Sequence, residues 1–193
     1  MLNIQEAHNL ALSSLSEKRF RHTLGVVEWT RELAVRHGVD KEKAQIAGYL
    51  HDLKKEVPLK QQLEMAREWR LLNYPEDEEA PYVLHGPLAA YWLEHEYGFT
   101  DSEILAAIAH HTLGAPGMGR LELLIYSADL TEPNRVFPKV DKLRQSLYDN
   151  LEIGTLLCVE HTLEYLKMSK QTIHPLTQLT YDDLKRRQKF ANG

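Results

Sequence analysis

The sequence contains a single cysteine, Cys158, and no long run of apolar residues. One thiol excludes an internal disulfide and any cysteine-based zinc or iron–sulfur site. Apolar stretches such as Ile104–Ala109 are far shorter than the roughly 20 residues that cross a bilayer, so no membrane partner is expected. No basic segment followed by an apolar core is present near the N-terminus, which predicts a cytoplasmic protein.

An excess of basic charge is also missing. The chain has 23 Lys and Arg against 28 Asp and Glu, a net charge of -5, which argues against a broad nucleic-acid-binding surface. The one compact basic run, residues 185–189, is interpreted as a solvated helix face, with an RNA-associated or scaffold role as the alternative. Other basic residues stand beside histidines and aspartates, where they suit a small phosphorylated ligand better than a polymer.

Segments that alternate apolar and polar residues with a period of two are absent, and most of the chain shows helical spacing. The sequence therefore predicts an all-α fold. We expect a single helical domain over residues 1–193, in which an N-terminal helix (1–16) and a C-terminal helix (about 178–190) pack on the rest. Ser16 and Asp40 are predicted N-caps and Gly38 a C-cap. Residues 71–84, with two prolines and an acidic run, are predicted to form a loop, with a mobile lid as the alternative.

The sequence has one adjacent His-Asp pair, His51-Asp52, placed at the end of a predicted helix. Imidazole and carboxylate together suit iron, manganese, cobalt or zinc. His22 and Asp129 would complete four protein ligands around one ion and leave positions open for water, as a catalytic metal site requires. An ion there would lower the pKa of bound water and neutralise phosphoryl charge, so no serine or cysteine nucleophile is needed.

A second group of histidines follows the pair. His85 and His111 would hold a second ion about 3.5–4 Å from the first, the usual spacing in two-metal hydrolases, and His110 is the weaker candidate for this position. The residues leave open whether one or two ions bind. Lys55 and Arg135 would stabilise charge on phosphate oxygens. The expected catalytic groups are thus Asp52, Lys55, His85 and His111.

Several segments in this order resemble the HD-domain superfamily of metal-dependent phosphohydrolases, and more closely the YqeK family of symmetrical dinucleoside-tetraphosphate hydrolases. The His-Asp pair alone resembles the superfamily, whereas the segments 132–135 and 173–175 resemble the narrower family. The matching segments are Arg19-Phe20-Arg21-His22, Ala47-Gly48 with Leu50-His51-Asp52 and Lys55, His85-Gly86-Pro87, His111-Thr112 with Gly114, Ala128-Asp129 with Glu132-Pro133-Asn134-Arg135, and Ile173-His174-Pro175.

The resemblance implies an HD-domain helical bundle with an iron-type centre held by His22, His51, Asp52 and Asp129. It implies symmetrical hydrolysis of diadenosine tetraphosphate to two ADP. The sequence leaves the oligomeric state open, with a homodimer as one alternative. His85 and His111 would bind either the second ion or the substrate. The implied substrate contacts are Arg19, Phe20, Arg21, His22, His85, His111, Arg135, Thr172, Ile173, His174, Pro175, Leu176 and Thr177.

Two other functions compete with this interpretation. Another HD-type enzyme, such as a nucleotidase or a phosphodiesterase, would use the same metal ligands, and only the segments 132–135 and 173–175 favour the dinucleotide. A non-catalytic iron-binding sensor is the second alternative. A hemerythrin-like bundle would space its ligands along helices, whereas this sequence has an adjacent His51-Asp52 at a helix end with basic residues nearby.

Overall fold

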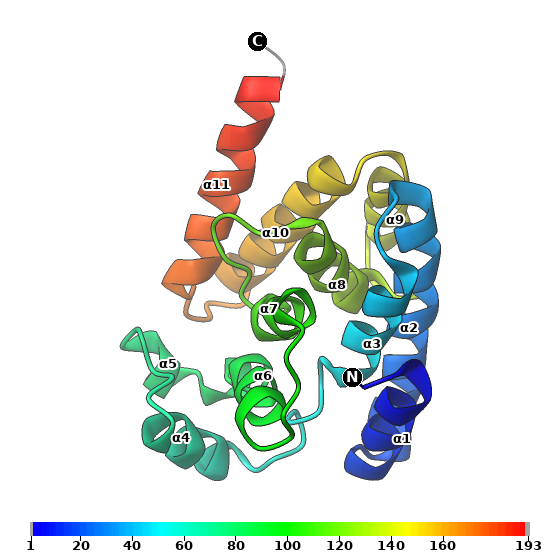
Figure 1. The fold of residues 1–193 in the computed structure, drawn as a ribbon. Helices are drawn as coiled ribbons and strands as arrows, with labels where there is room; N and C mark the ends of the chain where they lie inside the picture. The colour runs from blue at the N-terminus through cyan, green and yellow to red at the C-terminus, as the bar shows by residue number, and fades with distance from the viewer. Residues whose placement is uncertain (1, 192–193) are drawn as a thin grey trace.

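The computed structural model describes residues 2–191, and this part of the chain is helical with no strand (Figure 1). The predicted all-α class is confirmed. None of the described helices is both long and apolar enough to pass through a bilayer. The elements are α1 (Ile4–Ser14), α2 (Glu17–His37), α3 (Lys41–Leu50), α4 (Leu59–Glu68), α5 (Glu76–Glu79), the 3₁₀ turn η1 (Pro81–Val83), α6 (His85–His95), α7 (Ser102–His110), α8 (Arg120–Thr131), α9 (Val140–Asp149), α10 (Leu151–Met168) and α11 (Pro175–Ala191).

The helices pack around one principal apolar core. α2 lies against α3, α7 contacts both α6 and α8, and α10 contacts α8, α9 and α11. In Figure 1, α1 to α3 form one side of the molecule, α4 and α5 lie on the opposite side, and the far end of α11 projects from the body. Leu33, Leu50, Ile108 and Leu124 are fully buried in the core, which extends from Leu2 before α1 to Leu184 in α11.

The predicted caps are confirmed. The Ser16 side chain accepts a hydrogen bond from the Arg19 amide, and Asp40 accepts from the amides of Glu42 and Lys43. Gly38 ends α2 with φ 64°, a left-handed conformation that costs glycine little. These local interactions fix where α2 begins and ends and where α3 begins, and residues in α2 and directly after α3 belong to the site described below.

The structure differs from the sequence prediction in two places. Residues 71–84 contain α5 and η1 instead of an uninterrupted loop, because Asp77 turns inward and accepts hydrogen bonds from the amides of Asn73 and Tyr74. The C-terminal helix begins at Pro175 instead of at residue 178, since the fixed φ of proline suits the first position of a helix. It continues to Ala191, and Met1 of the predicted N-terminal segment lies outside the described residues.

The buried cysteine gives a test of this packing. Cys158 has no exposed surface, and burial raises the pKa of its thiol to about 12. We expect no reaction of the native protein with a disulfide-exchange thiol reagent at pH 8, and reaction of one thiol per chain after unfolding. Since the folded pKa exceeds the unfolded value of about 8.5, this burial contributes stability below that pH and loses it as the pH rises towards 12. Fast labelling of the native protein would contradict the packing.

Candidate metal centre

Six histidine and aspartate side chains meet where several helices begin or end. His51 and Asp52 directly follow α3, His85 is the first residue of α6, and His111 directly follows α7. His22 lies near the start of α2, and Asp129 lies in the last turn of α8. We call this group the His/Asp cluster. Its members are His22, His51, Asp52, His85, His111 and Asp129.

One half of the cluster joins His22, His51 and Asp129. The Nε2 atom of His22 lies 2.9 Å from Oδ1 of Asp129, and Nε2 of His51 lies 3.9 Å from the same oxygen. Oδ2 of Asp52 lies 3.3 Å from Nε2 of His51 and 3.8 Å from Nε2 of His22. These four side chains are the ones that the sequence predicted as ligands of one ion, and the fold brings them together.

The other half of the cluster faces the second oxygen of Asp52. Oδ1 of Asp52 lies 3.3 Å from Nε2 of His85 and 3.8 Å from Nε2 of His111. The Nε2 atoms of His85 and His111 lie only 2.9 Å from each other. Asp52 therefore presents one carboxylate oxygen to each half, the arrangement that lets a carboxylate bridge two ions.

The Nδ1 atoms of the four cluster histidines all have acceptor partners, so each ring is fixed in one tautomer. The partners are Glu132 Oε1 for His22 (3.2 Å), Gly48 O for His51 (2.7 Å), Tyr82 O for His85 (2.9 Å) and Ile108 O for His111 (2.7 Å). A carbonyl oxygen only accepts, so Nδ1 carries the proton and donates it. The Nε2 lone pairs then point into the cluster, which is how metal-ligating histidines are oriented.

This convergence of lone pairs fits a bound cation. Nε2 of His22 and Nε2 of His51 are buried and have no hydrogen-bond partner among the described residues. Both face carboxylate oxygens, which repel a nitrogen lone pair unless a positive charge lies between them. Ligand atoms of His22, His51 and Asp129, and likewise of His51, Asp52 and His111, lie within 4.8 Å of one another. The donor set of the cluster therefore suits a divalent metal.

Charge inside the cluster keeps its carboxylates ionised. Without a bound ion, protonation of His51 supplies this charge, since its burial lowers its pKa but the attraction of Asp52 raises the pKa overall. Burial alone would raise the pKa of Asp52, but the charge on His51 and the hydrogen bonds of His51 and His85 hold that pKa well below its usual range. A bound cation would take the place of that proton. The pKa of Asp129 is lowered in the same way, because His22 and His51 overcome its burial. Burial, together with the neighbouring His85 and His51, lowers the pKa of His111 to about 3, so this imidazole is neutral and able to bind a metal at physiological pH.

A glycine allows α6 and α7 to meet closely at the cluster. A Cβ atom on Gly86 would lie 2.9 Å from the carbonyl oxygen of Ile108 and 3.1 Å from Nδ1 of His111. Such distances are too short for a side-chain carbon, so α6 can start against the end of α7 only with glycine here. This contact places His85 beside His111.

Glu132 orients His22 from behind. It is almost fully buried, its Oε1 accepts from Nδ1 of His22, and its Oε2 accepts from the backbone amide (2.7 Å) and the side-chain amide (3.0 Å) of Asn134. Arg144 of α9 holds the same segment by donating to the carbonyl oxygens of Thr131, Glu132 and Arg135. The sequence marked Glu132 only as part of a motif, and nothing in it pointed to Arg144.

Three basic residues surround the cluster. Nη1 of Arg19 lies 3.1 Å from Oδ2 of Asp52, and Nη2 of Arg135 lies 3.2 Å from Oδ1 of Asp129. Burial lowers the pKa of Lys55, and the attraction of Asp52 and Asp129 offsets this only in part. The side chains of Arg19 and Arg135 remain 31% and 40% exposed, so each guanidinium group can reach a ligand that enters from solvent.

Three other predicted site residues lie apart from the cluster. The Phe20 ring packs edge-on against His8. Arg21 is exposed and pairs with Glu17. Nδ1 of His110 lies 2.6 Å from Oε1 of Glu122. The structure therefore separates the histidine doublet and gives the cluster position to His111.

Thr172, His174 and Thr177 of the segment 172–177 line a cavity of about 130 Å³ next to the cluster. Thr112, which the sequence did not single out as a site residue, connects the two, since its hydroxyl lies 3.2 Å from Nε2 of His85 and 3.1 Å from Nε2 of His111. We call this space the Thr112 cavity. Its lining residues are Glu76, Ala80, Tyr82, Val83, Thr112, Leu113, Thr162, Leu166, Thr172, His174 and Thr177.

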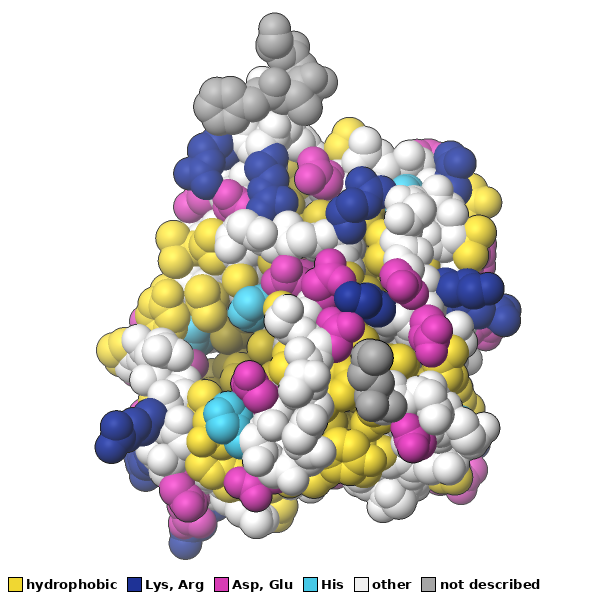
Figure 2. Space-filling model, viewed as in Figure 1, with side chains coloured by type: hydrophobic (Ala, Val, Ile, Leu, Met, Phe, Trp, Pro, Cys, Tyr) yellow, Lys and Arg dark blue, Asp and Glu magenta, His cyan; other side chains and the backbone are white. Residues whose placement is uncertain are grey.

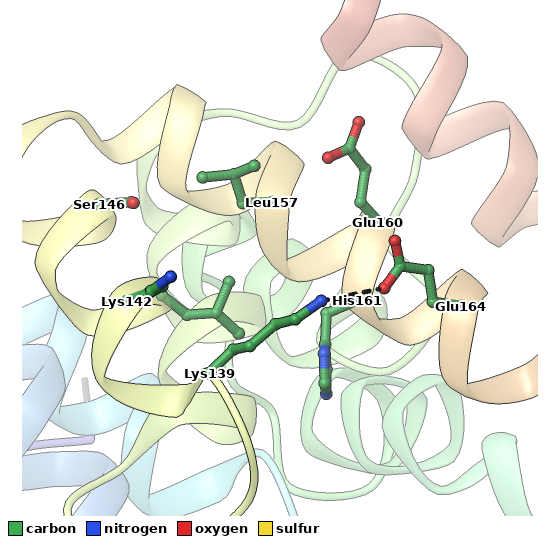
Figure 3. A pocket seen from close by; sticks show the side chains of 8 residues that line it. Lys139, Lys142, Ser146, Leu157, Glu160, His161 and Glu164 are labelled. Atoms are coloured by element: carbon green, nitrogen blue, oxygen red, sulfur yellow. Dashed lines mark ion pairs between the residues drawn. The ribbon is translucent and has the colours of Figure 1, made fainter.

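The remaining residues of that segment have other positions. Ile173 packs against the core, and Pro175 is the first residue of α11. Leu176 lines a different cavity, of about 180 Å³. A further cleft, of about 260 Å³, opens between α9 and α10 and contains the ion pair of Lys139 with Glu164 (Figure 3). Its lining comes from residues 139–146 and 157–164, away from the segments that form the His/Asp cluster.

Comparison with known proteins places this geometry in a family. The HD domain model matches residues 19–148, a range that includes all six residues of the His/Asp cluster, from His22 to Asp129. The chain belongs to the HD domain family. Within the matched range of this HD-domain protein lie all the residues of the His/Asp cluster and the three basic residues around it.

Named relatives are similar over nearly the whole chain. A Bacillus subtilis protein named "Bis(5'-nucleosyl)-tetraphosphatase, symmetrical" is 37% identical over 94% of this chain and 97% of its own length. A Halalkalibacterium halodurans protein of the same name is 35% identical over 97% of this chain and 100% of its own length. A crystal structure from Clostridium acetobutylicum, described as a "predicted HD superfamily hydrolase involved in NAD metabolism", has a TM-score of 0.89 and 32% identity, covering 95% of this chain and 97% of that one.

The contact of Glu132 with His22 predicts a loss of metal affinity on substitution. In Glu132→Gln one side-chain oxygen becomes an NH₂ group, which would face either His22 or the donors of Asn134. We expect divalent-metal affinity to fall by about 10–100-fold, as for other groups that orient a ligand from behind, measured by competition with a chelator.

Glu122→Gln is the matched control. Glu122 also accepts a hydrogen bond from a histidine Nδ1, but that histidine is His110, outside the cluster. The metal affinity of this variant should equal that of the wild type. Equal affinities in both variants would show that Glu132 does not orient a ligand.

Proposed function

We propose that this protein hydrolyses diadenosine tetraphosphate symmetrically to two ADP at the His/Asp cluster. The observation that carries the proposal is the buried convergence of four imidazole lone pairs on two carboxylates, in a chain 37% identical over nearly its full length to a relative named for this reaction. We place this activity in the cytoplasm. A homodimer and the absence of nucleic-acid binding stay predictions.

The metal of the proposed enzyme is iron, held by His22, His51, Asp52 and Asp129. Imidazole and carboxylate ligands without a thiolate also suit manganese, cobalt and zinc. His85 and His111, facing the second oxygen of Asp52, would hold a second ion. A divalent ion in such a site supplies Lewis acidity towards phosphoryl oxygens and lowers the pKa of bound water.

The basic residues supply the contacts that a polyphosphate needs. Arg19 and Arg135 each pair with a cluster carboxylate and still reach solvent, so each can bind a phosphate oxygen beside the reacting phosphorus. Guanidinium groups bind phosphate through two parallel N–H donors. The partly buried Lys55 adds a third positive charge where negative charge develops on the leaving phosphate.

The Thr112 cavity is the proposed site for one nucleoside end of the substrate. It adjoins His85 and His111 through Thr112, and its lining combines apolar side chains such as Val83 and Leu166 with the polar Thr172 and Thr177. This mixture is typical of small-molecule sites. A nucleoside anchored at one fixed distance from the cluster would place the middle of the tetraphosphate there, which accounts for symmetrical cleavage.

A second candidate is hydrolysis of a different nucleotide by the same cluster. The description of the Clostridium acetobutylicum neighbour, which mentions NAD metabolism, favours a substrate of this kind. It would use the same ligands and basic residues, so the geometry of the cluster does not separate the two. The products do.

Product analysis tests the proposed reaction. We expect the purified protein, loaded with each divalent metal in turn, to convert diadenosine tetraphosphate to ADP alone. Anion-exchange chromatography of the products measures this. Asp52→Ala should lose turnover, because Asp52 faces both halves of the cluster. ATP plus AMP as products would contradict symmetrical cleavage, and full turnover by Asp52→Ala would overturn the site.

The adjacent histidines provide a matched pair of variants. His111→Ala removes a side chain of the cluster and should lower turnover on the order of 10²–10⁴-fold. His110→Ala removes the partner of Glu122 and should leave turnover within about threefold of the wild type, since a surface change away from the site costs little. Steady-state kinetics with diadenosine tetraphosphate measure both. Loss of turnover in His110→Ala with retention in His111→Ala would reverse the assignment.

A further inference from the structure

A buried hydrogen bond joins two segments that are far apart in the sequence. Nε2 of His174, just before α11, lies 3.1 Å from Oδ1 of Asp77 in α5, and the two residues are 97 positions apart. Both side chains are almost fully buried, with 4% and 5% of their surface exposed. A buried carboxylate needs such partners, because an unpaired one would be costly.

The proton positions in this contact follow from the neighbouring bonds. The backbone amide of Leu176 donates to Nδ1 of His174 at 3.1 Å, so Nδ1 carries no proton. Nε2 therefore carries it and donates to Asp77. The other oxygen of Asp77 accepts from the amides of Asn73 and Tyr74, at 2.8 and 2.9 Å. Every polar atom of the pair thus has a partner, and His174 has no ring nitrogen left for a substrate.

The pair lies at the border of two cavities. Four residues of the segment 76–83 line one part of the Thr112 cavity, and Thr172, His174 and Thr177 line another part. Asp77 itself lines the 180 Å³ cavity, together with Leu176. Figure 2 shows a hollow with hydrophobic and histidine side chains around it, where α5 and the start of α11 approach each other in Figure 1.

The segment 71–84 depends on contacts of this kind for its position. α5 has only 4 residues, and helices that short are not stable by themselves. Tyr74 adds an edge-on contact with the His174 ring, at 5.1 Å between ring centres. Without the hydrogen bond to His174, Asp77 would be left buried with one oxygen unpaired, and the wall of the cavity would lose its attachment to α11.

We propose that Asp77 and His174 form a latch that holds the wall of the Thr112 cavity in its substrate-binding position. They are positioning residues and do not touch the reacting phosphorus. This inference rests on the proposed function, in which the cavity takes a nucleoside end. If the latch opens, only a fraction of molecules is competent to bind, and the apparent affinity falls by that fraction while the cluster itself is unchanged.

Two substitutions of His174 distinguish its hydrogen bond to Asp77 from the one it accepts from Leu176. His174→Gln can place its amide nitrogen where Nε2 was and still donate to Asp77. His174→Asn can accept from Leu176 but is too short to reach Asp77. We expect His174→Asn to raise KM for diadenosine tetraphosphate by roughly tenfold, the usual effect of losing one hydrogen bond to a charged group, with kcat within about threefold, and His174→Gln to restore most of the affinity.

Asp77→Asn tests the other partner. If its oxygen keeps the amides of Asn73 and Tyr74, its NH₂ group faces the Nε2 proton of His174, so the latch is lost. It should raise KM as His174→Asn does, and the double variant should be no worse than either single one, because both remove the same contact. His161→Asn, in the cleft of Figure 3, is the control histidine and should leave KM unchanged.

Amide hydrogen exchange gives a readout that needs no substrate. In His174→Asn and Asp77→Asn, exchange should accelerate in residues 73–84 and stay unchanged in α2, α3 and α8. Should wild-type protein produce no ADP from diadenosine tetraphosphate, the proposed function fails while exchange still tests the latch. Wild-type KM and wild-type exchange in His174→Asn would overturn the latch, as would equal losses in His174→Asn and His174→Gln.

Discussion

The structure depends on one constraint, the orientation of four imidazole rings whose Nε2 lone pairs face two carboxylates. Each ring is fixed through Nδ1, which donates to an acceptor behind it. Nitrogen lone pairs and carboxylate oxygens are both acceptors and cannot bond to each other, so the arrangement is stable only around positive charge. The helix ends, the close contact at Gly86 and the carboxylate of Glu132 all serve to hold this one geometry.

The basic residues and the cavity extend that centre into a site for an extended anion. Arg19 and Arg135 form ion pairs with the carboxylates of the cluster, and Thr112 lies between the cluster and the neighbouring cavity. Charge is thus concentrated at the metal site, while the less polar cavity lies beside it. A molecule with phosphates in the middle and a nucleoside at its end matches both parts.

The helical fold and the six cluster residues could be predicted from the sequence because both have local signatures. Caps such as Ser16 and Asp40 mark helix starts, and the adjacent His51-Asp52 marks the centre. Long-range partners leave no such trace. Arg144, whose carbonyl partners lie on another segment, and Asp77, which the sequence showed only as part of an acidic run in a predicted loop, acquire their roles only through tertiary contacts.

Three of the four cluster histidines donate to the carbonyl three residues before them, whereas His22 relies on Glu132, 110 positions away. The orientation of the three is therefore encoded within single turns of the chain and can form early in folding. That of His22 exists only after α2 has docked on the end of α8. The complete set of ligands therefore requires this tertiary contact, and because an ion that binds only the folded state stabilises it by mass action, a bound metal would favour the docked arrangement of α2 and α8.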